Sequence, residues 1–167
     1  MIQRIQSLYL VVIAALMATT IFAPLGWFAG AGEEFTLRAL GLENAAGEIV
    51  QSTRHLAILA VAAAALPLAI LFLYRRRMLQ LRLCAVEAVL LLGTALMEGI
   101  YYFLSWRVFS GVEFHAQGFR PAIVLPLVCL LFVYLAARAI LRDEALVRAA
   151  DRIRYPPPHY HETIVQP

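Results

Sequence analysis

The sequence predicts an all-α integral membrane protein, a four-helix bundle of transmembrane helices with a short cytoplasmic C-terminal helical extension. Two observations predict this class. Hydrophobic residues make up 62% of the 167 residues, charged residues only 15%, and the mean hydropathy is +0.77, a composition far from that of soluble domains. Four apolar segments are also long enough to supply the ~20 residues that a helix needs to cross ~30 Å of hydrocarbon.

The four predicted spans cover about residues 5–28, 56–74, 83–106 and 121–141. The first span follows a basic residue and precedes small residues, a pattern that also occurs in cleaved signal peptides. Its apolar run exceeds the ~7–15 residues of a signal-peptide core, so we expect a retained anchor. Residues 1–154 are therefore predicted as one membrane domain, and residues 155–167 as a mobile proline-rich tail.

The positions of the arginines predict which ends of the spans face the cytoplasm. All 14 basic residues are arginine, and they crowd the connection at residues 75–82 and the segment after the fourth span. Cytoplasmic connections carry an excess of basic residues. Both termini are therefore predicted on the cytoplasmic side of a bacterial inner membrane, where the arginines meet anionic lipid headgroups.

Two segments outside the spans have recognisable patterns. Residues 29–53 alternate weakly between apolar and polar side chains on either side of Asn44 and Gly47, which predicts a short β-hairpin against the membrane surface. Residues 142–154 place apolar side chains at helical spacing on one face. We expect these residues to continue the fourth helix into the cytoplasm.

The third span carries a line of polar residues through an otherwise aliphatic sequence. Glu87 and Glu98 are eleven positions apart, which places them ~20° apart around a helix axis and ~16 Å apart along it. A carboxyl group in hydrocarbon is costly unless it is protonated, paired or hydrated, so acids inside a span are candidates for functional sites. The predicted polar stripe consists of Glu87, Thr94, Glu98, Tyr101 and Ser105.

Both glutamates have candidate ion-pair partners. Glu87 lies near the predicted cytoplasmic end, where Arg4, just before the first span, is close in depth. Glu98 lies nearer the outer end, where Arg54 and His55 open the second span. Three roles stay open for Glu98: a hydrogen bond that packs helices, an ion pair with Arg54, or a protonatable site on the path of an ion or solute.

The sequence lacks the residues that several kinds of cofactor site and catalytic site require. The four histidines lie at or outside the predicted membrane boundaries, so haem would lack its pair of intramembrane ligands. Cys84 and Cys129 lie alone in apolar segments, and no phosphate-binding loop or HExxH motif occurs. We therefore expect no enzyme, no cofactor and no metal site. The clustered arginines are explained by topology, so we expect no nucleic-acid partner.

Three segments carry a resemblance to a known family. They read MIQRIQ at residues 1–6, LQLRLC at residues 79–84 and DEALVRAADRIR at residues 143–154. Together they resemble a family of small four-span inner-membrane proteins of Bacteroidota whose function is unassigned. The resemblance implies a fold and a location, without an activity, and it gathers family-like residues on the cytoplasmic side. The surface predicted there for a partner consists of Arg75, Arg76, Arg77, Arg82, Asp143, Glu144, Arg148, Asp151 and Arg152.

The leading functional prediction is a non-enzymatic membrane protein that acts as an accessory subunit and associates with another membrane protein or with itself. Small residues on helix faces and the lack of catalytic groups favour it. The alternative is a small transporter coupled to protons or a solute, in which Glu98, Glu87, Thr94 and Tyr101 line a path between helices. A third alternative, an enzyme acting on lipid-linked substrates, requires a polar cavity that the sequence does not indicate.

Overall fold

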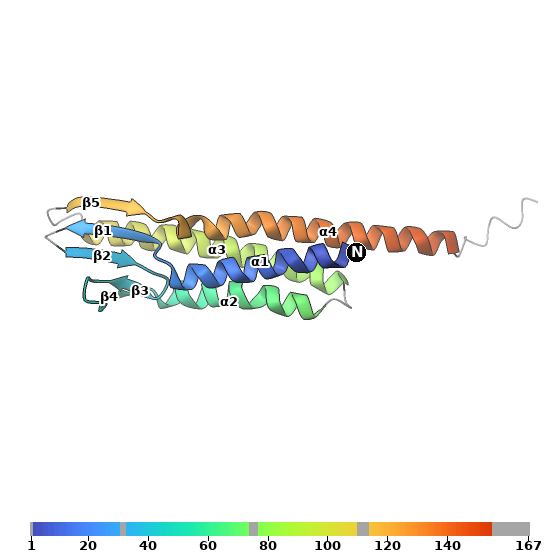
Figure 1. The fold of residues 1–167 in the computed structure, drawn as a ribbon, viewed down its shortest axis with the longest axis horizontal. Coiled ribbons are helices and arrows are strands. Elements are labelled where there is room, and N and C mark those ends of the chain that lie inside the picture. The colour runs from blue at the N-terminus through green and yellow to red at the C-terminus, as the bar shows by residue number, and fades with distance from the viewer. Residues whose placement is uncertain (1, 31–32, 74–76, 110–113, 155–167) are drawn as a thin grey trace, which may run out of the picture.

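The computed structural model describes residues 2–30, 33–73, 77–109 and 114–154 of the chain. The predicted tail, residues 155–167, lies outside them. Long helices run side by side, and short strands gather at one end of them (Figure 1). In chain order the elements are α1 (Ile2–Phe22), β1 (Gly26–Gly30), β2 (Glu33–Leu37), β3 (Gly41–Glu43), β4 (Ile49–Ser52), α2 (Arg54–Phe72), α3 (Arg77–Phe109), β5 (Phe114–Phe119), the 3-10 helix η1 (Pro121–Val124) and α4 (Leu125–Arg154).

This arrangement corrects the predicted fold class. The chain is a mixed α/β protein, and the all-α prediction is wrong, because the described residues include a five-stranded antiparallel sheet in the order β4-β3-β2-β1-β5. The first predicted span, residues 5–28, covers two elements, since α1 ends at Phe22 and β1 begins at Gly26. Pro24 lies between them. A proline disfavours helical backbone at the residue before it, which explains why the helix stops there.

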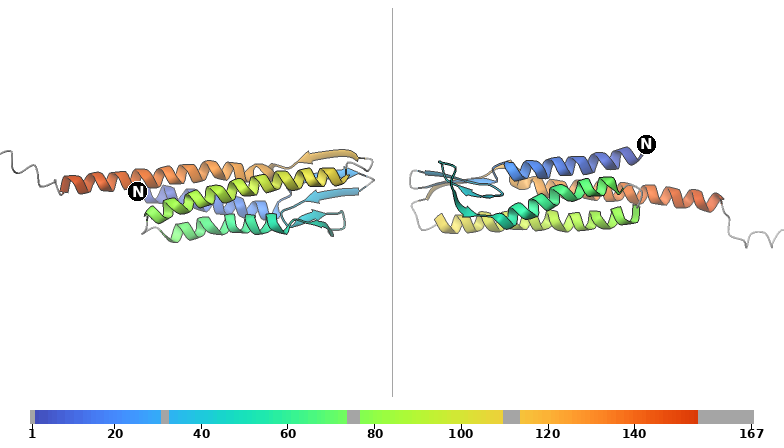
Figure 2. Two further views of the ribbon diagram at one scale, coloured as in Figure 1. Left: turned by 180° about the vertical axis from the view of Figure 1, so that it is seen from behind. Right: turned by 90° about the horizontal axis from the view of Figure 1, so that it is seen from below.

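Each of the four helices packs against two neighbours. α1 contacts α2 and α4, and α3 contacts the same two helices. Successive helices run in opposite directions. α1 and α3 run toward the sheet and α2 and α4 run away from it, and the N-terminal end of α1 lies at the end opposite the sheet (Figures 1 and 2). Residues 142–154, predicted as a helical extension, are the continuous end of α4, which projects beyond the other helices. The buried apolar interior between the helices consists of Leu10, Ile13, Met17, Ala60, Ala63, Ile70, Cys84, Leu91, Cys129, Val133, Ala136 and Ile140.

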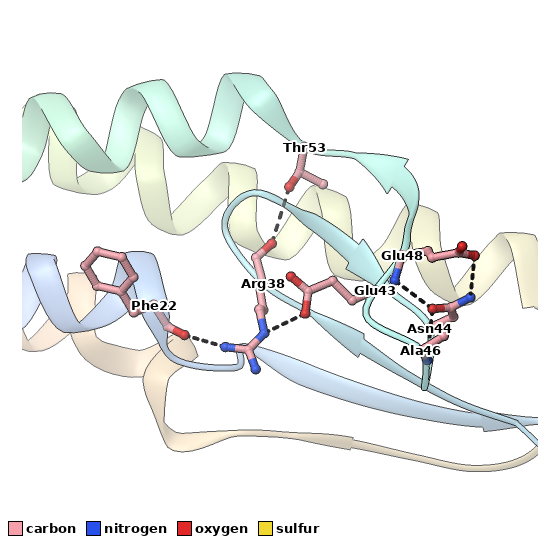
Figure 3. A network of polar contacts seen from close by, with 7 residues as sticks. All are labelled: Phe22, Arg38, Glu43, Asn44, Ala46, Glu48 and Thr53. Carbon is pink, nitrogen blue, oxygen red and sulfur yellow. Dashed lines mark hydrogen bonds and ion pairs between the residues drawn. The ribbon is translucent and has the colours of Figure 1, made fainter.

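The hairpin predicted around Asn44 and Gly47 is confirmed by the pairing of β3 with β4. Asn44 Oδ1 accepts hydrogen bonds from the backbone N–H groups of Ala46 at 3.1 Å and Glu48 at 2.8 Å (Figure 3). Gly47 has a φ of +81°, a left-handed conformation that glycine adopts without a Cβ clash. These local interactions set the turn. The pairs β1–β2 and β2–β3 also join consecutive strands, whereas the pairing of β5 with β1 joins segments far apart in the sequence.

A polar network ties the sheet to the end of α1 (Figure 3). The last carbonyl groups of a helix have no partner within it. Arg38 supplies one, because its Nη1 donates to the backbone oxygen of Phe22 at 2.6 Å while its Nε donates to Glu43 Oε2 at 2.9 Å. Thr53 Oγ1 donates to the backbone oxygens of Ala39 at 2.8 Å and Arg38 at 3.3 Å. The network fixes the end of α1 and the start of α2 against the connection between β2 and β3.

The sheet lies beside the last turns of α3, where Tyr102 joins the two layers. Its ring centroid lies 5.0 Å from that of Phe28 in β1 and 4.2 Å from that of Phe119 in β5, stacked on the latter. Gly26 gives the ring space, since a Cβ there would come 2.9 Å from Tyr102 Cε2. The buried apolar cluster at this junction consists of Leu25, Phe28, Leu37, Ala39, Leu42, Leu56, Tyr102 and Ala122.

Candidate functional site

One face of α3 presents polar side chains to the interior between the helices. The buried members of this face recur at steps of seven or four residues, spacings that keep side chains on one side of a helix packed against neighbours. The sequence prediction missed Gln80, although its distance of seven positions from Glu87 was the available signal. The buried polar residues of α3 are Gln80, Glu87, Thr94, Glu98 and Ser105. Tyr101 lies at the margin of this face and is half-buried.

Glu87 is fully buried, and neither of its carboxyl oxygens has a hydrogen-bond partner among the described residues. Cys84 lies three positions before it on α3, and both Cys84 and Cys129 of α4 belong to the buried apolar interior between the helices. Cys129 Sγ in turn lies 4.0 Å from the backbone oxygen of Ile13 on α1. The predicted partner Arg4 belongs to α1, but its side chain lies outside the described part of the chain. The ion pair between Arg4 and Glu87 stays a prediction.

Glu98 is 1% exposed, and its carboxyl oxygens also lack a hydrogen-bond partner within the described residues. Arg54 begins α2, is exposed, and forms no ion pair in the part of the chain that the structure describes. His55 Nδ1 lies 3.3 Å from the hydroxyl oxygen of Tyr101. The structure therefore brings His55 to the polar stripe but joins it to Tyr101, and it leaves Glu98 without either of the predicted partners.

The other polar members of the α3 face differ in how they are satisfied. Thr94 Oγ1 donates to the backbone oxygen of Leu90 one turn earlier, at 2.8 Å. Gln80 Nε2 donates to the backbone oxygen of Ile70 in α2 at 3.4 Å. Ser105 Oγ has no partner among the described residues. A buried polar group without a hydrogen bond costs ~1–3 kcal/mol, and a charged one costs more, so the two glutamates are the most expensive groups on this face.

The two carboxyl groups can communicate only through an intermediary. They are ~16 Å apart along α3, far beyond the ~3 Å of a hydrogen bond. Thr94 lies between them, with its hydroxyl proton engaged by Leu90. Because of this separation, proton transfer between Glu87 and Glu98 would need water molecules in the helix interior.

A metal site is a separate question. Within the described residues, no group of three or more His, Cys, Asp or Glu side chains could hold a metal ion.

α3 and its neighbouring helices have the length and apolar composition of membrane-spanning helices. Three helical segments in the described residues are long and apolar enough to cross one, namely Arg54–Phe72, Met78–Val108 and Pro121–Val147. Gln6–Phe22 of α1 is a shorter apolar segment. Large apolar side chains such as Val89, Leu96 and Leu131 are exposed on the outer surface of the helices. Exposed apolar surface along long helices indicates a membrane-associated protein.

A family model described as a domain of unknown function, DUF4293, matches residues 2–153. The chain belongs to the DUF4293 family. The match runs from the start of α1 to the last turn of α4, so the DUF4293 domain includes both the helices and the sheet. It confirms the resemblance to a family whose function is unassigned. No curated protein matches the chain.

The cytoplasmic partner surface predicted for this DUF4293 chain lies at the end of the helices opposite the sheet. Arg82 on α3 is exposed there, whereas Asp143 and Glu144 on α4 are partly buried and engaged in interactions. Arg75 and Arg76 lie outside the described residues. Side chains of four further members also lie outside them, although their backbone is helical: Arg77, Arg148, Asp151 and Arg152.

Proposed function

We propose that this DUF4293 protein is a non-enzymatic accessory subunit that associates with another membrane protein or with further copies of itself. The projecting end of α4 carries the proposal (Figure 2). A helix gains most of its stability from packing an amphipathic face, and the end of α4 extends past the other helices. Val147 on this segment is 43% exposed. A partner that covers the projecting end would bury such apolar side chains.

The proposal includes four spans in a bacterial inner membrane, with both termini in the cytoplasm and the sheet outside. α1 would supply the fourth span, since its 21 residues reach ~30 Å. The arginines support the orientation, because they are more numerous at the end opposite the sheet than beside it, and cytoplasmic ends carry the excess of basic residues. In this orientation the projecting end of α4 meets partners at the cytoplasmic face.

Association through α4 can be tested on the full chain extracted in a mild detergent. We expect the native chain to elute as a stoichiometric complex, and Val147→Glu to release it, because the new carboxylate opposes burial of that surface. Ile49→Glu is the matched control. Ile49 is 56% exposed in β4 at the opposite end, so this variant should stay in the complex. A native chain that is monomeric and without partners across detergents would refute the proposal.

A second candidate, a transporter coupled to protons or a solute, is supported by the two buried glutamates. Neither Glu87 nor Glu98 has a hydrogen-bond partner within the described residues, and acids placed in this way inside spans commonly serve transport. We expect proteoliposomes of the native chain to carry protons down an imposed gradient, read with an internal pH-sensitive dye, and Glu98→Gln to stop the flux. Glu48→Gln, in the exposed hairpin, should leave it unchanged. Flux no faster than in empty liposomes would exclude proton transport.

A further inference from the structure

A groove between α1 and α4 lies at the end of the helices opposite the sheet. Its volume is about 700 Å³, and Tyr9 of α1 and residues 135–146 of α4 line it. The groove is separate from the polar face of α3, because none of its lining residues comes from that helix. Neither proposed function assigns a ligand to the groove, although its lining includes Arg142, Ala145 and Leu146 near the end of α4 that the association proposal uses.

Two cationic side chains in this groove have no anionic partner among the residues that the structure describes. Arg138 and Arg142 are one helical turn apart on α4, so their side chains lie on the same face. Both are exposed, and neither takes part in an ion pair within the described residues. A guanidinium group binds phosphate through two parallel hydrogen bonds. The pair therefore offers donors for one phosphate group.

The remaining groove lining is apolar apart from one phenol. Leu135 continues the arginine face toward the sheet end, and Ala139 lies between the two arginines along α4. Tyr9 closes the groove from α1, and its ring is held 6.1 Å from the ring of Phe132 on α4. Tyrosine is favoured where hydrocarbon meets headgroups, because its ring is apolar and its hydroxyl is polar. Cations, a phenol and an apolar floor together match an amphiphile with an anionic head.

The depth of the groove agrees with such a ligand. α4 begins at Leu125 beside the sheet end, and a rise of ~1.5 Å per residue places Arg138 ~20 Å and Arg142 ~26 Å further along. In a hydrocarbon layer of ~30 Å, these positions fall in the last third. Arg138 belongs to the apolar segment Pro121–Val147. An arginine at this depth reaches toward the headgroups or draws a phosphate to itself.

We propose that the groove binds one phospholipid with an anionic headgroup. Arg138 and Arg142 hold the phosphate, the Tyr9 hydroxyl lies at the ester level, and an acyl chain follows Leu135 toward the sheet. The proposal rests on the membrane location within the proposed function, and it requires neither association through α4 nor transport.

Native mass spectrometry of the full chain tests the site. The chain is released from detergent micelles doped with phosphatidylglycerol or with phosphatidylcholine of the same acyl chains. We expect one phosphatidylglycerol to be retained in preference to phosphatidylcholine. The double substitution Arg138→Gln and Arg142→Gln should reduce this preference about tenfold, as expected for loss of charge-assisted hydrogen bonds. Arg54→Gln with Arg120→Gln, two exposed arginines at the sheet end, is the matched control and should keep it.

The outcomes separate the alternatives. Equal retention of the two lipids by the native chain, an unchanged preference in the groove variant, or competition by millimolar inorganic phosphate would each overturn the lipid site. Loss of a protein complex in the groove variant, with lipid preference intact, would assign the groove to a protein and also overturn it. Arg138→Lys with Arg142→Lys should keep part of the preference, which shows that the site is intact. A native chain that stays soluble without detergent would instead refute the membrane location.

Discussion

Tyr102→Ala will lower the free energy of unfolding by about 3 kcal/mol, the usual scale for truncating a buried aromatic side chain. Tyr102 is 8% exposed and lies between the rings of Phe28 and Phe119. The stacked contacts are lost together with the buried area, and the backbone at Gly26 cannot fill the space. The sheet should therefore loosen from α3 while the helices stay packed.

Limited proteolysis in detergent, followed by mass spectrometry, measures this effect at the level of elements. In Tyr102→Ala, cleavage within residues 33–53 should become faster, and the helical fragments should persist. Phe103→Ala is the matched control, because Phe103 is 53% exposed on the next position of α3 and its truncation removes little buried surface. Equal protection of the two variants would show that the aromatic stack does not hold the sheet.

The helices could be predicted because length and apolar content alone define them. α2 runs from 54 to 72, within two residues of the predicted start. The sheet could not be predicted in the same way. The strand Gly26–Gly30 is apolar and continues a hydrophobic run, so hydropathy merges it with α1. Its partner β5 lies more than eighty residues later, and single-sequence alternation contains no information about such pairing.

In the candidate site, the sequence predicts which residues share a helix face, but it does not predict which residues contact one another. Helical periodicity was enough to place Glu87, Thr94 and Glu98 on one face, and the structure buries all three. The hydrogen-bond partners of these side chains could not be predicted from the neighbouring sequence. Equal depth suggested His55 for Glu98, yet the His55 ring meets the Tyr101 hydroxyl. The groove at Arg138 needed the neighbouring position of α1, which only the packed helices reveal.

Glu98→Met will raise the unfolding temperature of the purified chain, because a buried carboxyl without a partner destabilises the native state. Replacing such a group by an apolar side chain of similar volume removes the desolvation cost, and gains of ~1–3 kcal/mol are typical. Glu98→Gln keeps a polar group of the same size, so it should gain less. Thermal unfolding in detergent, followed by circular dichroism, compares these variants with Thr94→Val as the control, since Thr94 already donates to Leu90.

The Glu98 result also tests why a costly residue stands there. Sites retained for function commonly lower stability, so a more stable Glu98→Met chain that has lost proton flux would identify the carboxyl group as the transport site. If Glu98→Met is more stable and still associates through α4, then Glu98 is not needed for the proposed accessory role. A loss of stability in both Glu98→Met and Glu98→Gln would mean the opposite, that the carboxyl group has a stabilising partner. Because Glu87 is ~16 Å away, its own substitution should add independently.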